Sequence, residues 1–247
     1  MSITFKLHRR LRTAVTPSPN VIEVAAMFGL GIDEQHELEI IPQTNLTLEP
    51  HQLTFITGPS GSGKSSLLNL LDSAATTRDD VRIIRFDHLN APADKPLVDL
   101  FNSFGNPPLE QVMRWLSLAG LNDAFVMLRT PNELSDGQRY RLRLAQTIAA
   151  VESASIKPSP TQNSKLETRN TRLPIVLADE FGATLDRRTA TVIARNVRKW
   201  VTRTPVAFVA ATTHDDLLEP FEPDVLIEKP LGKAVHIWRR GGDNEAC

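Results

Sequence analysis

Apolar residues recur with two different spacings along the chain, and each spacing predicts a type of element. Ile3, Phe5 and Leu7 alternate with polar neighbours, which predicts a short strand with one buried face at the edge of a sheet. Continuous or alternating apolar runs predict further strands at 37–41, 46–48, 53–57, 81–86, 175–178, 206–210, 225–228 and 234–238. Apolar residues spaced three or four apart predict helices at 20–28, 65–72, 97–104, 112–119, 136–151 and 187–203.

Strands and helices alternate through most of the chain, and this order indicates a fold class. Such alternation is typical of an α/β domain with a mostly parallel sheet covered by helices. We find no internal repeat, so residues 1–247 are expected to form a single domain, whose helical part spans about 95–150. Residues 152–172 are rich in Ser, Thr, Pro, Asn and Lys and poor in apolar side chains, so we expect a disordered surface insertion there.

Composition excludes several classes of protein. The formal net charge of −1 provides no general attraction for nucleic acid or an anionic membrane, so a nucleic-acid partner is not expected. No apolar run approaches the roughly 18 residues of a membrane span, and residues 1–12 lack the apolar core of a secretory signal. The single cysteine, Cys247, excludes an internal disulfide. These features together favour a cytoplasmic protein.

The strongest chemical signal is a glycine-rich loop between a predicted strand and a predicted helix. Gly58 and the pair Gly63-Lys64 have the spacing of a phosphate-binding Walker A loop. The glycines allow backbone N–H groups to surround an anion, and the helix that follows directs its positive end at the same point. We expect Lys64 to reach the β- and γ-phosphates of ATP and the Ser65 hydroxyl to bind Mg²⁺. The predicted ATP-binding residues here are Gly58, Pro59, Ser60, Gly61, Ser62, Gly63, Lys64, Ser65 and Ser66.

A second motif narrows the family. Leu134-Ser135-Asp136-Gly137-Gln138 precedes a long predicted helix and resembles the LSGGQ signature of ATP-binding cassette (ABC) ATPases. The resemblance implies a P-loop fold of the ABC type, with a helical signature subdomain. It also implies a head-to-tail dimer, in which Ser135, Gly137 and Gln138 of one subunit contact the ATP held by the phosphate loop of the other. Asp136 replaces the usual glycine; we favour a role as helix cap, and altered affinity for the second nucleotide is the alternative.

The remaining family motifs follow in the family's order. Ile175 to Glu180 resembles a Walker B strand, which implies that Asp179 helps to hold Mg²⁺ and that Glu180 is the general base that polarises the attacking water. The segment 183–186 resembles the D-loop, so Asp186 is expected at the dimer interface. Thr213-His214 resembles the switch motif, which implies that His214 contacts the γ-phosphate.

Two positions depart from the family pattern. The family has a glutamine after the strand that follows the phosphate-loop helix, whereas this chain has Asp87, which either substitutes as a ligand in the Mg²⁺ shell or simply forms a turn. The short distance from the phosphate-loop helix to Val81 implies a reduced antiparallel subdomain. Phe28 is the candidate for stacking on adenine, and its helical spacing fits a core position equally well.

These motifs leave three functions open. The leading one is a stand-alone ABC-type ATPase that forms a homodimer with ATP and Mg²⁺ and acts on an unknown protein partner. The second is the nucleotide-binding subunit of a membrane permease. It is disfavoured because the glutamine, which in the family couples hydrolysis to a transport partner, is missing here. The third is an ATP-dependent switch in DNA maintenance, for which the sequence offers no heptad arm or strong basic stripe.

Overall fold

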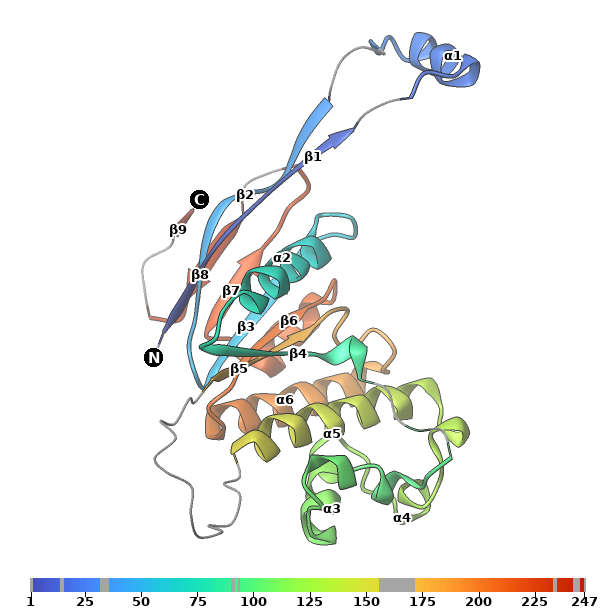
Figure 1. Cartoon of the computed structure of the whole chain (residues 1–247), viewed down its shortest axis with the longest axis vertical. Helices are drawn as coiled ribbons and strands as arrows, with labels where there is room; N and C mark the ends of the chain where they lie inside the picture. Colours follow the sequence, from blue (N-terminus) through green and yellow to red (C-terminus); the bar gives the residue numbers. More distant parts are fainter. Residues whose placement is uncertain are drawn as a thin grey trace.

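A parallel sheet forms the centre of the molecule. The structure is a computed structural model that describes residues 2–13, 16–31, 36–89, 92, 94–155, 172–232, 235–241 and 245–246. Among these residues, seven strands pair in the order β4-β5-β6-β3-β7-β8-β9 (Figure 1), and the first five are parallel. The bounds are β3 Gln52–Thr57, β4 Val81–Arg85, β5 Leu173–Ala178, β6 Ala207–Ala211, β7 Val225–Glu228, β8 His236–Arg239 and β9 Glu245–Ala246. The expected α/β fold with a mostly parallel sheet is confirmed.

Alternating side chains of the strands pack into two cores, one on each face of the sheet. In β5, Val176 and Ala178 join the core with α5 (Asp136–Ser155) and α6 (Arg187–Arg203), while Ile175 and Leu177 face α2 (Lys64–Thr76). These strands are apolar on both faces because helices or the N-terminal hairpin cover both faces. The periodicity of the sequence therefore predicted their burial correctly.

A long antiparallel hairpin extends from the α2 face. Strands β1 (Ile3–Thr13) and β2 (His36–Leu48) pair with each other and form a two-stranded sheet of their own (Figure 1), so β1 does not lie at the edge of a larger sheet as expected. Two segments predicted as separate strands are one strand, β2. Its pairing with β1 shifts register between Leu7 and Arg9 of β1 and again between Arg9 and Arg10. Pro42 lies opposite this irregularity, where a residue without an N–H is tolerated.

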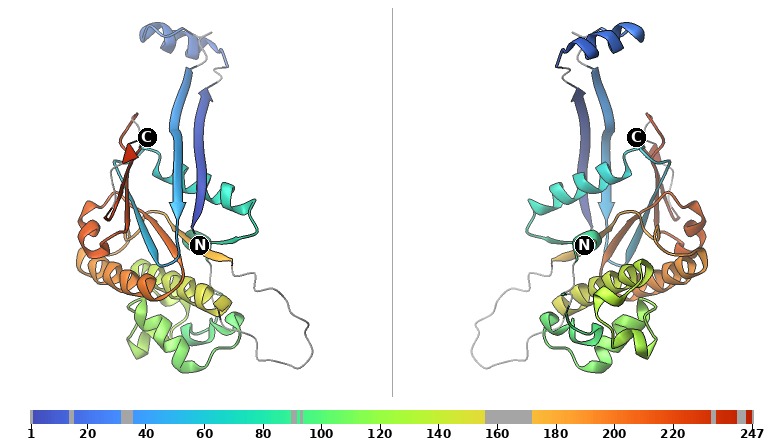
Figure 2. Two further views of the ribbon diagram at one scale, coloured as in Figure 1. Left: turned by 90° about the vertical axis from the view of Figure 1, so that its left-hand side faces the viewer. Right: turned by 90° about the vertical axis from the view of Figure 1, so that its right-hand side faces the viewer.

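The hairpin has a packed base and a projecting tip. Ile3, Phe5 and Leu7 are buried in the same core as Leu67 and Leu71 of α2, so the base is fixed to the body. Beyond the strands, α1 (Pro19–Met27) lies at the far end of the hairpin in both Figure 1 and Figure 2. Helix α1 has no buried residue, so it contributes nothing to the core of its own chain.

The helical part lies below the sheet in Figure 1. It contains α3 (Leu109–Leu118), α4 (Ala124–Met127) and the start of α5. Leu97, Leu100 and Phe101 are buried there, but the helix expected over 97–104 is two short 3₁₀ turns, η2 (Leu97–Asp99) and η3 (Asn102–Phe104). The other short elements are η1 (Phe86–His88), η4 (Pro131–Glu133), η5 (Asp215–Leu217) and α7 (Leu218–Phe221).

Glu152 joins three helices of the lower core. Its carboxylate, 14% exposed, accepts hydrogen bonds from the indole N–H of Trp115 at 2.8 Å and of Trp200 at 3.1 Å. Gln111 and Arg114 also donate to it, so α3, α5 and α6 meet at this carboxylate. Glu152 was expected to begin a disordered insertion; instead α5 continues to Ser155, and residues 156–171 lie outside the described residues.

We predict that Glu152→Ala lowers the free energy of unfolding by about 2 to 4 kcal/mol, because two buried indole N–H groups lose their acceptor. Urea denaturation measures the change. Glu110→Ala, an exposed carboxylate of α3, is the matched control and should cost about 0.5 kcal/mol or less. Equal effects of the two substitutions would contradict a structural role for the Glu152 carboxylate.

Candidate functional site

Three neighbouring strands end at one edge of the sheet and bring their loops together. Strand β3 pairs with β6, which pairs with β5, and all three are parallel. The backbone continues this contact past the strands: Thr212 N–H donates to the Ile56 carbonyl at 3.0 Å, and Phe181 N–H donates to the Ala211 carbonyl at 2.9 Å. Because ligands of open α/β sheets bind at the carboxyl ends of the strands, this edge is the candidate site.

The loop between β3 and α2 turns around the Lys64 side chain. Gly58, Gly61 and Gly63 have φ values of +141°, +74° and +102°, a region that L side chains rarely adopt. The Lys64 ammonium donates to the carbonyls of Gly58 at 2.7 Å and Pro59 at 2.9 Å. The loop carbonyls therefore hold the Lys64 ammonium. An anionic ligand can replace them as its hydrogen-bond partner.

Gly58 is also required by its surroundings. A Cβ built on Gly58 would lie 2.2 Å from the Lys229 carbonyl oxygen at the end of β7, too close for any real contact. A Cβ on Gly61, by contrast, would meet nothing within 4 Å. The close approach at Gly58 fixes the position at which the loop leaves the sheet.

A cleft of about 420 Å³ opens above this loop. Its lining comes from the loop, the start of α2, the segment after β5 and the segment after β6. Eight predicted residues and three others line it: Ser60, Gly61, Gly63, Lys64, Ser65, Ser66, Asp179, Glu180, Ala183, Thr212 and Thr213. The structure thus gathers the predicted phosphate loop and the predicted acidic pair in one cavity.

The charges in this cleft act on Lys64. Burial lowers the pKa of the Lys64 ammonium, and the carboxylates of Asp179, Asp215 and Glu180 partly oppose that effect. Asp215 was not predicted from the sequence; its carboxylate accepts a hydrogen bond from Thr57, the last residue of β3. The three carboxylates offset only part of the cost of burying the Lys64 charge. The cleft therefore favours the binding of a multiply charged anion.

Glu180 has an unusual backbone conformation. Its φ of +49° lies in the left-handed region, although it is not a glycine. Glu180 N–H donates to the Asp179 carboxylate at 3.0 Å, and the Glu180 carbonyl accepts from Ala183 N–H at 3.0 Å. Such conformations cost about 1 to 3 kcal/mol and cluster at functional sites. The tight turn exposes the Glu180 side chain at the mouth of the cleft.

Ser135 and Gln138 cap the N-terminus of α5. Ser135 Oγ accepts from Gln138 N–H at 3.3 Å, and the Gln138 side chain accepts from Ser135 N–H at 3.0 Å. This is a reciprocal capping box. The cap expected at Asp136 is therefore wrong: Asp136 is the first helical residue, and its carboxylate pairs with Arg139 at 3.0 Å. A cap must precede the first turn to reach its N–H groups.

A buried tyrosine connects α5 to the loop after β5. Gly182 N–H donates to the Tyr140 hydroxyl at 2.9 Å, and burial raises the pKa of that hydroxyl. The Tyr140 ring packs against Phe86, with ring centroids 4.7 Å apart, and against Phe181 at 5.9 Å. One side chain thus ties the helix that Ser135 caps to the segment that carries Glu180.

Several predicted site residues lie outside the lining of the cleft. Ser62 is a buried residue of the loop, and its Oγ has no hydrogen-bond partner among the described residues. His214 is half-buried, and its N–H donates to Thr212 Oγ at 3.2 Å. Asp186 caps α6 by accepting from Thr189 N–H at 3.0 Å. Hydrogen bonding to Thr189 lowers the pKa of Asp186. Ser135, Gly137 and Gln138 also lie outside the lining.

Asp87 is held by an arginine instead of facing the cleft. Arg85 donates to both carboxylate oxygens of Asp87 at 3.0 Å, and this pairing lowers the pKa of Asp87. Arg85 also donates to Asn69 at 3.0 Å, so the pair is anchored to α2. Asp87 lies outside the lining of the cleft and both of its oxygens accept from Arg85, which favours a structural role over the alternative of a ligand in the Mg²⁺ shell.

Phe28 is also far from its expected place. It follows α1 at the tip of the hairpin and is 75% exposed, while the phosphate loop lies at the body of the molecule (Figure 1). Neither the stacking role nor the core role agrees with this position. The helical spacing around Phe28 is real, but no residue of the helix is buried against the described part of the chain.

The residues around the cleft fit a magnesium nucleotide. A Cβ at Gly58 would collide with the Lys229 carbonyl and crowd Ser62 Oγ. That hydroxyl is buried without a hydrogen-bond partner in the described part of the chain, and Lys64 supplies the cation. Within the described part of the chain, no three His, Cys, Asp or Glu side chains gather where they could hold a metal ion by themselves. Mg²⁺ is typically held by one or two carboxylates together with phosphate oxygens, so Ser65 and Asp179 suffice for such a site.

Comparisons with known proteins agree with this geometry. A family model described as ABC transporter matches residues 41–92. The chain is 26% identical over 186 residues to the lipoprotein-releasing system ATP-binding protein LolD of Maricaulis maris, covering 61% of this chain and 78% of LolD. It is 28% identical over 149 residues to the maltose/maltodextrin import ATP-binding protein MalK of Escherichia coli, covering 51% of this chain and 40% of MalK.

A solved structure shares the fold. The dimeric structure of MJ0796, a bacterial ABC transporter cassette, matches 84% of this chain and 94% of its own, with a TM-score of 0.57 and 19% identity. The chain therefore resembles ABC-type ATPases in sequence over part of its length and shares the fold of an ABC cassette. The same MJ0796 cassette has been solved in a post-hydrolysis state with ADP and Pi. None of the described helices of this chain is both long and apolar enough to cross a membrane.

We predict that Gly58→Ala abolishes ATP binding by the cassette, because the new Cβ must displace the Lys229 main chain and with it the loop. Gly61→Ala is the matched control: it adds the same methyl group at a left-handed position with open space, and should cost about 1 kcal/mol of stability while retaining measurable binding. Equilibrium binding of a fluorescent ATP analogue distinguishes the two. Equal affinities would show that the contact at Gly58 is unimportant.

The lowered pKa of Lys64 predicts a pH dependence of ATP binding. A bound phosphate stabilises the ammonium and raises the pKa again, so above the lowered pKa binding takes up a proton and affinity falls as pH rises. The fall should begin below pH 10.5, the ordinary lysine value, and approach about tenfold per pH unit.

The control for this prediction is Lys64→Arg, measured by the same binding assay across pH. A guanidinium keeps its proton throughout, so the slope assigned to Lys64 should disappear whatever the absolute affinity. A slope that persists unchanged in Lys64→Arg would assign the pH dependence to another group.

Proposed function

We propose that this ATPase works as a head-to-tail dimer, in which ATP and Mg²⁺ lie between the phosphate loop of one copy and Ser135, Gly137 and Gln138 of the other. The observation that carries the proposal is that, within one chain, the phosphate loop and the start of α5 do not line the same cleft. The phosphate loop and acidic pair line one cleft, whereas the start of α5 lies outside its lining. A complete site of the family type therefore needs a second copy.

The roles follow from the positions around the cleft. We assign the phosphates of ATP to Lys64 and the loop N–H groups, and Mg²⁺ to Ser65 and Asp179. Glu180, at the mouth of the cleft, is placed to polarise the attacking water as general base. His214 needs to approach the γ-phosphate after the nucleotide binds, and Asp186 is assigned to the dimer interface.

The start of α5 is suited to contact a second copy. A Cβ on Gly137 would meet Leu185 and the Thr184 carbonyl at 3.6 Å, an ordinary contact, so packing within the chain does not require glycine there. The Ser135 hydroxyl accepts from Gln138 N–H, and this leaves its own proton available to donate to a phosphate. Both features favour a function of this segment between subunits.

A second candidate is a nucleotide-binding subunit that couples to a membrane partner. LolD and MalK, whose names describe lipoprotein release and maltose import, favour it. Against it stands the Arg85–Asp87 pair, which ties the segment after β4 to α2 where the family has its coupling glutamine. Co-purification with a membrane-spanning protein from native membranes would favour a role in transport over a stand-alone ATPase.

The decisive experiment is the oligomeric state of Glu180→Gln with ATP and Mg²⁺, measured by light scattering. Because the amide cannot act as a base, hydrolysis should slow by at least about 100-fold and a dimer with two ATP should accumulate. The same protein without nucleotide should remain monomeric. Glu219→Gln, an exposed carboxylate of α7, is the control and should hydrolyse ATP like the parent.

Two further variants make the result specific to the proposed interface. Ser135→Arg places a bulky cation at the start of α5 and should abolish dimerisation while leaving ATP binding by the monomer intact. Lys64→Ala should abolish both. A Glu180→Gln protein that binds ATP and stays monomeric at all accessible concentrations would overturn the proposed mechanism.

A further inference from the structure

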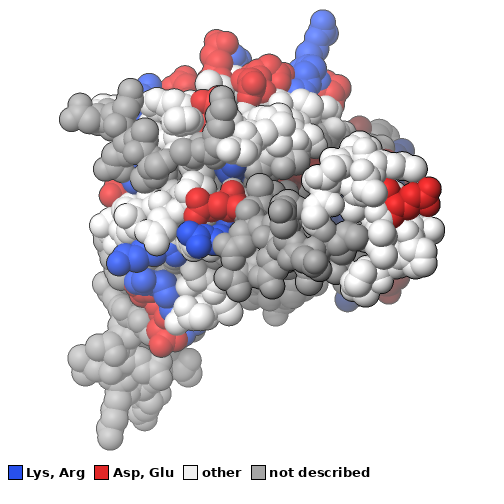
Figure 3. Space-filling model, turned by 90° about the horizontal axis from the view of Figure 1, so that it is seen from above, with Lys and Arg blue, Asp and Glu red and all other residues white. Residues whose placement is uncertain are grey.

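The hairpin tip exposes apolar side chains. The exposed fractions at the tip are 48% for Ile22, 52% for Val24, 70% for Met27, 75% for Phe28 and 53% for Leu30. Seen from above in Figure 3, the end of the molecule that carries α1 is almost entirely uncharged. Glu23 is the one charged residue in the stretch 16–31 of the sequence. Five exposed large apolar side chains on one projecting element mark an interaction surface.

The base of the hairpin holds this surface away from the body. Ile3, Phe5 and Leu7 anchor β1 to α2, and the paired strands then carry α1 well beyond the sheet (Figure 2). Helix α1 has an N-cap at Ser18, whose Oγ accepts from Val21 N–H at 3.3 Å, so it is locally stabilised. A capped helix with no core contact is suited to contact another surface.

A second apolar patch lies at the opposite end of the same chain. In the helical part, the exposed fractions are 60% for Leu109, 45% for Met113, 78% for Phe125 and 68% for Leu128. Leu109 and Met113 lie one turn apart on α3, whose other face buries Trp115. Residues Phe125 and Leu128 belong to α4 and its C-cap.

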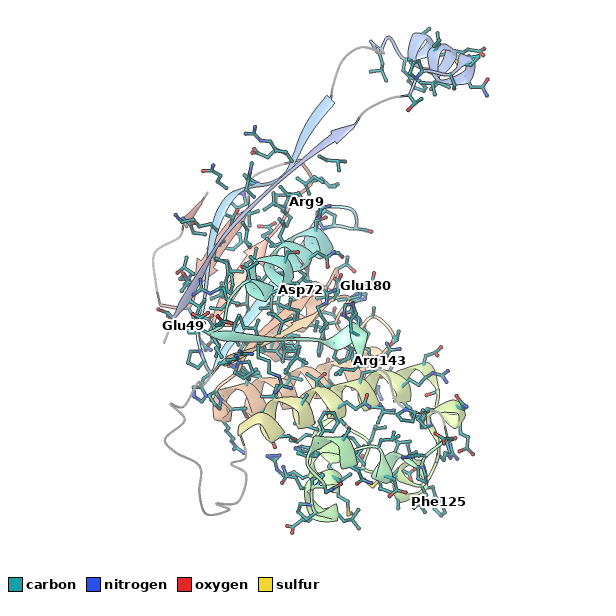
Figure 4. The ribbon with its side chains drawn as sticks, viewed as in Figure 1. Arg9, Glu49, Asp72, Phe125, Arg143 and Glu180 are labelled. Carbon is teal, nitrogen blue, oxygen red and sulfur yellow. The ribbon has the colours of Figure 1, made fainter. Side chains whose placement is uncertain are left out.

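The two patches are placed to meet in a head-to-tail dimer. In Figure 4, Phe125 lies at the lower end of the long axis and α1 at the upper end, with Glu180 between them, and all three lie toward the same side of the molecule. A two-fold axis that sets each phosphate loop opposite the start of the partner's α5 also sets the upper end of one copy beside the lower end of the other. This argument rests on the dimer proposed above.

We propose that, in the ATP-bound dimer, the tip formed by α1, Phe28 and Leu30 packs against α3 and α4 of the second copy. The contact is isologous, so it occurs twice, and each copy both gives and receives a tip. A second copy is favoured over other occupants because the same chain supplies an apolar complement for the tip at the position that the two-fold axis requires. Each hairpin would then act as a clasp outside the two nucleotide sites.

The first test measures the dimer dissociation constant of the Glu180→Gln protein with ATP and Mg²⁺. Adding Met27→Ser and Phe28→Ser should raise it by about tenfold or more, since two central apolar anchors are lost from each of two contacts. Phe125→Ser with Leu128→Ser should have a comparable effect. Val192→Ser, an exposed apolar residue of α6, is the control and should change the constant less than twofold.

The tip substitutions should leave the folding of the monomer unchanged. No residue of α1 is buried, so thermal melting and ATP binding by the monomer should match the parent. If the tip variants dimerise as tightly as the parent, the clasp is overturned while the proposed dimer stands. If the parent Glu180→Gln protein binds ATP and does not dimerise, both fail.

The second test is a cross-link between different copies. In a Cys247→Ser background, one protein carries Phe28→Cys and another carries Phe125→Cys, and the two are mixed with a short bis-maleimide reagent. ATP with Mg²⁺ should produce a heterodimeric product that is absent without nucleotide and absent when Thr202→Cys replaces Phe125→Cys. No product in a mixture that light scattering shows to be dimeric would overturn the inference.

A third measurement tests whether the tip binds lipid instead of a second copy of the chain. Vesicles of anionic phospholipid should not sediment the parent protein more than the Met27→Ser, Phe28→Ser variant. Tip-dependent binding to these vesicles, together with unchanged dimerisation of the variant, would assign the tip to a membrane surface and overturn the clasp.

Discussion

The position of β3 in the middle of the parallel sheet is the constraint on which the site depends. Because β3 pairs with β6 on one side and β7 on the other, the loop after Thr57 emerges between two neighbours. The carbonyl of Lys229 at the end of β7 leaves no space for a side chain at Gly58, and Thr212 after β6 is hydrogen-bonded to the β3 backbone. The glycine loop is thus shaped by the sheet before any nucleotide binds.

The sequence predicted those parts of the site whose functional residues are neighbours in the chain. The phosphate loop from Gly58 to Ser65 and the pair Asp179-Glu180 each follow an apolar strand, so local pattern and local chemistry coincide. The sheet and its flanking helices were predictable for the same reason, because burial on both faces produces uninterrupted apolar strands. The comparisons and the sheet topology confirm the fold, and the roles of individual site residues stay predictions.

The parts that the sequence did not reveal depend on partners distant in the chain, on side-chain geometry, or on whether a helix finds a surface to pack against. Glu152 follows a helix and precedes a polar stretch, and only the fold brings the Trp115 and Trp200 indoles to it. Asp87 looked like a free carboxylate because the bidentate arginine that occupies it requires a particular side-chain geometry. Phe28 has the spacing of a buried residue, but spacing cannot show whether a helix finds a surface within its own chain.

The hydrogen bonds around the start of α5 bear on the dimer proposed above. Ser135 and Gln138 satisfy each other's backbone N–H groups, so the start of α5 is held by contacts within its own chain. The hydrogen bond from Gly182 N–H to the Tyr140 hydroxyl ties that helix to the segment carrying Glu180. In the proposed dimer, a phosphate loop placed opposite Ser135 would therefore meet a surface that binding does not first have to order.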